Sequence, residues 1–241
     1  MPELSLAAVD VLWEDLRLGA LPFPLRVRGF GDTLDERADI RAGVYAELER
    51  RGLTRRGRPE PSLESVLGLL ARPEVSVDLV ARLEPGDQPV SAVGVAAGRR
   101  AVRAVQRGDA IELTEVRDTA VVAAVVELLP PNPPGPGRSV TLPAAALQAK
   151  RPGEHRGELR QIGSIMERPV LRVGQLGAML RDERGGLRRL PGVAWFDTDQ
   201  GRYATTVRRG SDGVDWTTLS PVDNGRLVHR LSEMLSGAGR R

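Results

Sequence analysis

The residues that could carry out chemistry are few in this sequence. It contains two histidines, His155 and His229, and no cysteine. Neither histidine lies at the spacing that a metal site or a nucleophile–base arrangement needs. Asp197 and Asp199 resemble the start of a calcium loop, but the twelfth position is Arg208, where a bidentate glutamate is required. We therefore expect no enzyme activity, no catalytic residue, no metal and no cofactor, and we interpret 197–201 as a turn between strands.

The charge composition suggests a nucleic-acid partner less strongly than the isoelectric point implies. The pI is about 10.1, yet 35 Lys and Arg face 32 Asp and Glu, a net charge of only +3. Lys150 is the one lysine, and arginine does not titrate below about pH 12, so a small excess raises the pI steeply. A solvated arginine-rich surface is the favoured interpretation, with no nucleic acid bound. An arginine-rich nucleic-acid-binding regulator stays open as the alternative.

The hydropathy of the chain and its first residues indicate where in the cell we expect the protein. Apolar residues make up 41% of the chain, and no apolar run reaches the length of about 18 residues that a membrane-spanning helix needs. The first residues, Met1 to Leu4, are acidic where a signal peptide is basic. We expect a cytoplasmic protein with no membrane contact.

The first 72 residues have the apolar spacing of helices. Thr33 and Glu36 have the spacing of a capping box, and Ile40, Val44 and Leu48 form one stripe behind it. Strand patterns and turns follow, and the segment from Pro130 to Gly137 is rich in proline, which predicts an exposed polyproline-type linker. The predicted helices of this half are 5–18, 33–52, 62–71 and 118–129, and the predicted strands are 75–83, 90–97, 99–106 and 110–116.

The second half repeats the strand-rich pattern. Ser220 is a plausible helix N-cap, with Pro221 at the first helical position. The predicted helices are 143–150, 155–167 and 220–235, and the predicted strands are 170–181, 192–197, 202–208 and 214–219.

The two halves also resemble each other in sequence. The block from Gly98 to Gly108 matches the block from Gly201 to Gly210, and each is followed by a strand and a helix. Agreement of order, turn residues and helix register favours duplication over chance. We predict an α+β fold: one domain over 1–241 with a pseudo-twofold repeat (halves about 73–135 and 168–236, linker 130–137) and a central, mostly antiparallel sheet flanked by helices.

Several short motifs follow one another along nearly the whole chain. They are Leu12-Trp13-Glu14, Leu21-Pro22-Phe23-Pro24-Leu25, Leu70-Ala71-Arg72-Pro73-Glu74-Val75, Trp195-Phe196-Asp197, Gly201-Arg202-Tyr203, Trp216, Pro221 and Leu227. In this order and spacing they resemble the EspG-type secretion-associated chaperones of actinobacterial type VII (ESX) secretion systems.

The resemblance implies a non-enzymatic role and a specific partner. Such chaperones bind the PPE protein of a PE–PPE heterodimer in the cytosol, cover its apolar tip, keep the pair soluble and target it to its secretion system. An exposed apolar tip would drive self-association, and reversible binding calls for an interface of moderate size. An exposed sheet edge would in addition permit a homodimer.

The resemblance also suggests where the partner binds, namely the central sheet and the C-terminal helical part. For each residue an ordinary core position is the alternative. The short loop 84–89 and the linker 130–137 are variable elements that could contribute. The expected partner-binding residues are Ile162, Met166, Gln175, Met179 and Phe196.

Overall fold

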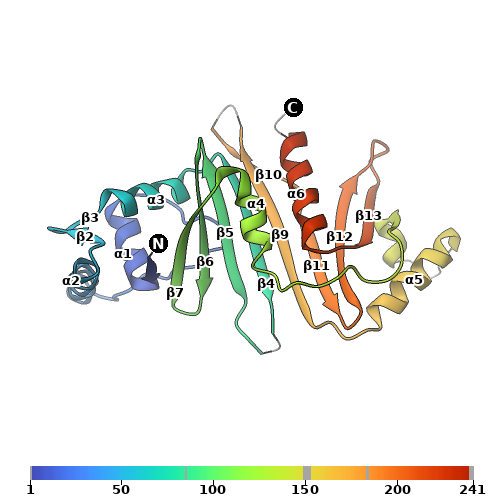
Figure 1. Ribbon diagram of the computed structural model, residues 1–241, viewed down its shortest axis with the longest axis horizontal. Helices are drawn as coiled ribbons and strands as arrows, with labels where there is room; N and C mark the ends of the chain where they lie inside the picture. The colour runs from blue at the N-terminus through green and yellow to red at the C-terminus, as the bar shows by residue number, and fades with distance from the viewer. Residues whose placement is uncertain (1, 85, 149–152, 183–184, 239–241) are drawn as a thin grey trace. The chain divides into compact units, whose positions relative to one another are not determined.

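The computed structural model describes residues 2–238 except 85, 149–152 and 183–184 (Figure 1). The chain divides into two compact units. The first comprises Met1–Asp78 and Val90–Val125, and the second comprises Leu79–Pro89 and Val126–Arg241. Strand β4 (Val75–Arg82) begins in the first unit and ends in the second.

The first unit is an antiparallel sheet with helices on both faces, and its strand order is β1-β7-β6-β5-β4. Its elements are β1 (Glu3–Ser5), α1 (Leu6–Asp15), α2 (Leu34–Arg50), β2 (Thr54–Arg55), β3 (Arg58–Pro59), α3 (Pro61–Ala71), β5 (Val90–Ala97), β6 (Arg100–Arg107), β7 (Ala110–Val116) and α4 (Val121–Val126).

Successive residues of β5 contact helices on opposite faces of this sheet. Val93 and Val95 pack in one core with side chains of α1 and α3. Gly94, between them, faces α4: a Cβ at Gly94 would lie 2.8 Å from a methyl carbon of Val125. Successive strand residues point to opposite faces, so the absence of a side chain at Gly94 lets α4 approach the sheet closely.

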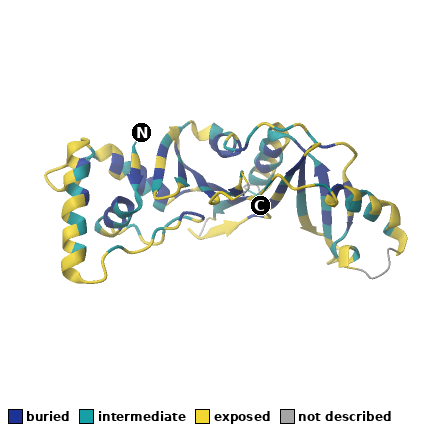
Figure 2. Ribbon diagram, turned by 90° about the horizontal axis from the view of Figure 1, so that it is seen from below, coloured by how far each residue is buried: buried dark blue, intermediate teal, exposed yellow. Residues whose placement is uncertain are grey.

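Helix α2 contributes the buried Val44 and Leu48 to the same core as α1, and charged and polar side chains add to the contact; much of its remaining surface is exposed (Figure 2). Arg37 pairs with both Asp10 and Glu14, and its hydrogen bond and charge lower the pKa of Glu14. The Tyr45 hydroxyl donates to Asp15 at 2.9 Å, and burial raises the pKa of Tyr45. The predicted capping box of Thr33 and Glu36 is confirmed at the start of this helix.

The second unit has the strand order β4-β9-β11-β12-β13-β8, with β10 also paired to β9. Its elements are β8 (Val140–Pro143), 3-10 turns at Ala144–Gln148 and Gly153–His155, α5 (Arg156–Met166), β9 (Arg172–Arg181), β10 (Leu187–Arg189), β11 (Val193–Thr198), β12 (Gly201–Arg209), β13 (Asp215–Pro221) and α6 (Asn224–Ala238).

The predicted α+β class with antiparallel sheet is confirmed. Both units contain four strands in meander order followed by a helix: β4 to β7 then α4, and β9, β11 to β13 then α6. This shared element order agrees with the repeat inferred from the sequence. The single domain over 1–241, the pseudo-twofold axis and the boundaries 73–135 and 168–236 stay predictions.

Three local predictions are wrong. Ser220 and Pro221 do not start the last helix, because they pair with β12 as the end of β13. Asp223 accepts the backbone N–H of Arg226 at 2.8 Å instead, just before α6. The helix predicted over 118–129 is short, with α4 ending at Val126. The helix predicted over 143–150 is a 3-10 turn to Gln148, and its last two residues lie outside the described part of the chain.

The segment 130–137 is held along β12, so the predicted exposed linker is wrong for Gly135, whereas residues 131, 133, 136 and 137 are exposed as predicted. The backbone of Arg202 donates to the carbonyl of Pro133 (2.8 Å) and accepts from Gly135 (3.0 Å). Gly135 is buried, and a Cβ there would lie 2.2 Å from the ring of Tyr203. Proline removes donors but leaves carbonyls free to accept, so a proline-rich segment can still be held by its neighbours.

The side chain of Arg202 joins four segments of the second unit. It is fully buried and forms two hydrogen bonds with the buried carboxylate of Asp197, at 2.7 and 2.9 Å. The same guanidinium donates to the carbonyl of Pro130 at 2.9 Å and to the side chain of Asn224, and it lies 4.8 Å above the Trp195 ring. Its planar set of five donors suits such a network.

We predict that Arg202→Met strongly destabilises the protein. It leaves Asp197 buried without its main partner, and breaking a buried pair from one side costs about 3–5 kcal/mol. The matched control is Arg209→Met on the same strand, which breaks an exposed pair with Asp215 and should cost less than about 1 kcal/mol. Urea unfolding followed by circular dichroism measures both; equal losses would contradict the assignment.

Candidate functional site

The partner-binding residues expected from the sequence fall on α5 and on the sheet of the second unit. On α5, Ile162, Ile165 and Met166 share one side of the helix through their spacing of three and four residues. Ile165 is buried against the sheet, Ile162 is half-buried, and Met166 is 55% exposed at the end of the helix. The helix therefore presents an apolar edge next to the sheet that it covers.

The register of β9, β11 and β12 decides which side chains share the α5 face of the sheet. Phe196 pairs with Val173 on one side and with Tyr203 on the other. The rings of Phe196 and Tyr203 stack with centroids 5.6 Å apart. Gln175 pairs with Ala194, two residues further along the same face.

A small apolar cluster connects α5 to this face. Its buried members are Ile165, Tyr203 and Leu219, and Ile162 and Phe196 pack against it while remaining partly exposed. The structure therefore brings together two of the expected residues, Ile162 and Phe196, in one cluster. We name the exposed surface beside this cluster the α5–β9 face, made up of Ile162, Met166, Val173, Gln175 and Phe196.

Met179 lies apart from that cluster. It is half-buried and pairs with Arg189 of β10, beyond the stretch of β9 that pairs with β11. Sequence reasoning also missed Val173, which is 48% exposed. Its place two residues before Gln175 in a strand could have indicated a shared face.

The α5–β9 face is suited to binding and lacks the groups of a catalytic centre. Its side chains are apolar apart from the Gln175 amide. Among the described residues, no three histidine, aspartate or glutamate side chains gather in a way that could hold a metal ion. Among the residues that the structure describes, no helix is long and apolar enough to cross a membrane.

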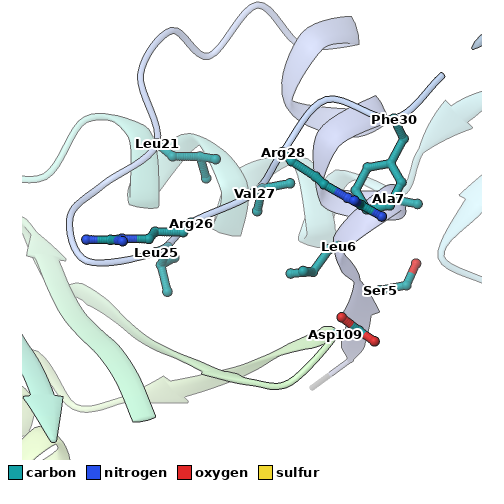
Figure 3. A pocket seen from close by; sticks show the side chains of 10 residues that line it. All are labelled: Ser5, Leu6, Ala7, Leu21, Leu25, Arg26, Val27, Arg28, Phe30 and Asp109. Atoms are coloured by element: carbon teal, nitrogen blue, oxygen red, sulfur yellow. The ribbon is translucent and has the colours of Figure 1, made fainter. Parts of the chain in front are cut away.

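A hollow of about 820 Å³ lies in the first unit (Figure 3). Leu6 of α1 and Leu21, Leu25 and Val27 of the following segment line it, and Arg28 lies over the ring of Phe30. None of these side chains was expected to bind a partner. The lining combines apolar side chains with backbone that is fixed to β6 through Gln106, which exchanges two 2.8 Å hydrogen bonds with Arg26.

Comparison with known proteins shows the protein family to which this chain belongs. A family model described as the EspG family matches residues 5–233. The chain belongs to the EspG family. The resemblance inferred from the motifs is thereby confirmed over nearly the whole chain.

A solved structure has the same fold as this EspG-family chain. It is the type VII secretion system chaperone EspG5 of Mycobacterium tuberculosis, determined in complex with the PE25–PPE41 dimer. The two chains share 16% sequence identity with a TM-score of 0.74, over 97% of this chain and 95% of the other. No protein among curated sequences matches this chain.

We predict that Tyr203 ionises at unusually high pH. Its hydroxyl donates to the carbonyl of Pro136 at 3.0 Å, and burial raises its pKa above the usual 10. Because the folded pKa exceeds the unfolded one, the stabilisation is complete below about pH 10 and is lost as the pH rises through the folded value. In Tyr203→Phe, which keeps the ring stack, the loss of stability as the pH rises above about 10 should be smaller.

Absorbance at 295 nm, in native buffer and in denaturant, measures this ionisation, and urea unfolding across the pH range measures the loss of stability. Tyr45 is the only other tyrosine and its pKa is also raised, so Tyr203→Phe assigns the difference. Native and denatured titrations that coincide would contradict the prediction.

Proposed function

We propose that this EspG-family protein is a cytoplasmic chaperone. It binds the PPE member of a PE–PPE heterodimer, keeps the pair soluble and targets it to a type VII secretion system. Membership of the family over residues 5–233 carries this proposal. The fold shared with EspG5, whose solved structure contains a PE–PPE dimer, supports it.

The α5–β9 face is the surface that we assign to the client. Val173 and Met166 are about half exposed, 48% and 55%, while Ile162 and Phe196 are partly buried against the packed cluster. Exposed apolar patches with a packed base mark interaction sites. An apolar helix tip of the client would bury these side chains, which lowers the free energy of the complex by about 25 cal/mol per Å² removed from water.

Gln175 and Met179 are assigned to the edge of the same interface. The Gln175 amide is exposed next to Val173 and offers both a donor and an acceptor to the client backbone. Met179 extends the apolar strip along β9, and its flexible thioether adapts to an irregular partner surface. A mixed apolar and polar rim is typical of interfaces that must release their partner.

The test is co-expression of the tagged chain with PE–PPE pairs of its host, followed by size-exclusion chromatography. We predict a soluble complex of the three chains. Val173→Asp and, separately, Met166→Asp should weaken it at least about tenfold, because each buries an unpaired charge. Affinity is measured by biolayer interferometry with the purified PE–PPE dimer.

The matched control is Leu34→Asp, at the start of α2. Leu34 is 89% exposed and belongs to the first unit, so the same substitution there alters hydrophobicity and charge outside the residues of the α5–β9 face and should leave affinity unchanged. Failure of the wild-type chain to recover any PE–PPE pair from its host would contradict the chaperone function. Full binding by both aspartate variants would contradict only the assigned surface. Retention of the free chain on DNA at about 0.1 M salt would instead support the nucleic-acid alternative.

A further inference from the structure

The opposite face of the second unit's sheet contains a hollow of about 620 Å³ that the proposed function does not use. Along β12, Tyr203 points toward α5, so Thr206 and Arg208 point to the other face by strand alternation. Both residues line the hollow. The hollow therefore lies on the other side of the sheet from the α5–β9 face, and its size is in the usual range for small-ligand sites.

Two rows of cross-strand neighbours form the floor of the hollow. Thr206 pairs with Thr218, which pairs with Thr141, and the hydroxyls of the last two lie 2.9 Å apart. Arg208 pairs directly with Trp216, so these two side chains are cross-strand neighbours in the lining of the hollow. The floor thus offers hydroxyl groups, one positive charge and one flat apolar surface.

Helix α6 supplies the wall. Arg230 and Met234, one helical turn apart, both line the hollow. The Nη1 atom of Arg230 is buried and has no hydrogen-bond partner in the described part of the chain. A buried guanidinium nitrogen without an acceptor is costly and calls for an explanation, and a ligand oxygen in the hollow would provide the acceptor.

The charges around the hollow determine the kind of anion that fits. Arg208 and Arg230 contribute two positive charges, and the carboxylate of Asp212, which accepts the N–H of Val214 at 2.9 Å, contributes one negative charge. The balance of one positive charge matches a carboxylate better than a phosphate dianion. Trp216 and Met234 add apolar surface beside the donors.

We propose that this hollow binds a carboxylate that is joined to a flat apolar group, with the carboxylate on Arg230 and Arg208 and the apolar group against Trp216. Two sources present this chemistry: a free small carboxylic acid, and the C-terminal residue of a polypeptide with an aromatic side chain. The site is independent of the client surface, so the two proposals stand or fall separately.

Isothermal titration calorimetry on the full chain tests the chemistry with two pairs of probes. The first pair is 3-phenylpropionate and its neutral amide; the second is N-acetyl-Ala-Phe as free acid and as amide. We expect each acid to bind with a Kd below about 1 mM and each amide at least about tenfold more weakly. The acid that binds more tightly, small molecule or peptide, identifies the source.

Variants locate the binding. Arg230→Met, which keeps the length of the stem, should weaken acid binding at least about tenfold. Arg208→Met provides a second variant with an exposed side chain, in case the first fails to fold. Arg226→Met, one turn before Arg230 on α6 and outside the hollow, removes the same charge and should leave the Kd within twofold of wild type.

Three results would overturn the proposal. They are the absence of binding by either acid at 10 mM, equal binding of acid and amide, and wild-type affinity in folded Arg230→Met and Arg208→Met.

Discussion

The buried pair of Arg202 and Asp197 is the interaction on which the second unit depends. Neither side chain has exposed surface, so each charge depends on its partners: Arg202, with Arg172 at 3.5 Å, compensates the carboxylate of Asp197. The same guanidinium holds the carbonyl of Pro130 and the side chain of Asn224, which fixes both the proline-rich segment and the start of α6. The entry of a helix and the path of a loop are thus set by one side chain on a strand.

Consecutive residues of β12 therefore organise opposite faces of the sheet. Arg202 points to the α6 side and binds the charged and polar groups there, while Tyr203 points to the α5 side and stacks on Phe196. The two faces acquire different chemistry as a result. The α5 side is an apolar platform with an exposed edge, and the α6 side has arginines, threonines and an indole around a hollow. A large apolar partner and a small anion would therefore not compete for the same side chains.

Local signals in the sequence predict the structure where the interacting residues are close along the chain. The capping box of Thr33 and Glu36 and the turn over 197–201 rest on residues a few positions apart. The last helix was predicted to start too early because Ser220 and Pro221 form a good local cap, yet they pair with β12. The binding of the proline-rich segment depends on Arg202, about 70 residues away, and no local pattern carries that information. At the site, the family resemblance led to Ile162 and Phe196, which the structure brings together. It also led to Met179, which pairs with β10 outside their cluster.

Some of the arginines have a structural explanation that does not require nucleic-acid binding, because their guanidinium groups donate to backbone carbonyls of the same chain. Arg103 donates to the carbonyl of Ala124 in α4, Arg172 to that of Leu83 and Arg202 to that of Pro130. In each case a guanidinium reaches a backbone carbonyl that a helix or loop leaves free, and a lysine would supply fewer donors with no fixed plane. Arg103, Arg172 and Arg202 therefore act as structural donors in a chain that has a single lysine and a net charge of only +3. The high isoelectric point then follows from the choice of arginine over lysine and requires no anionic polymer as partner.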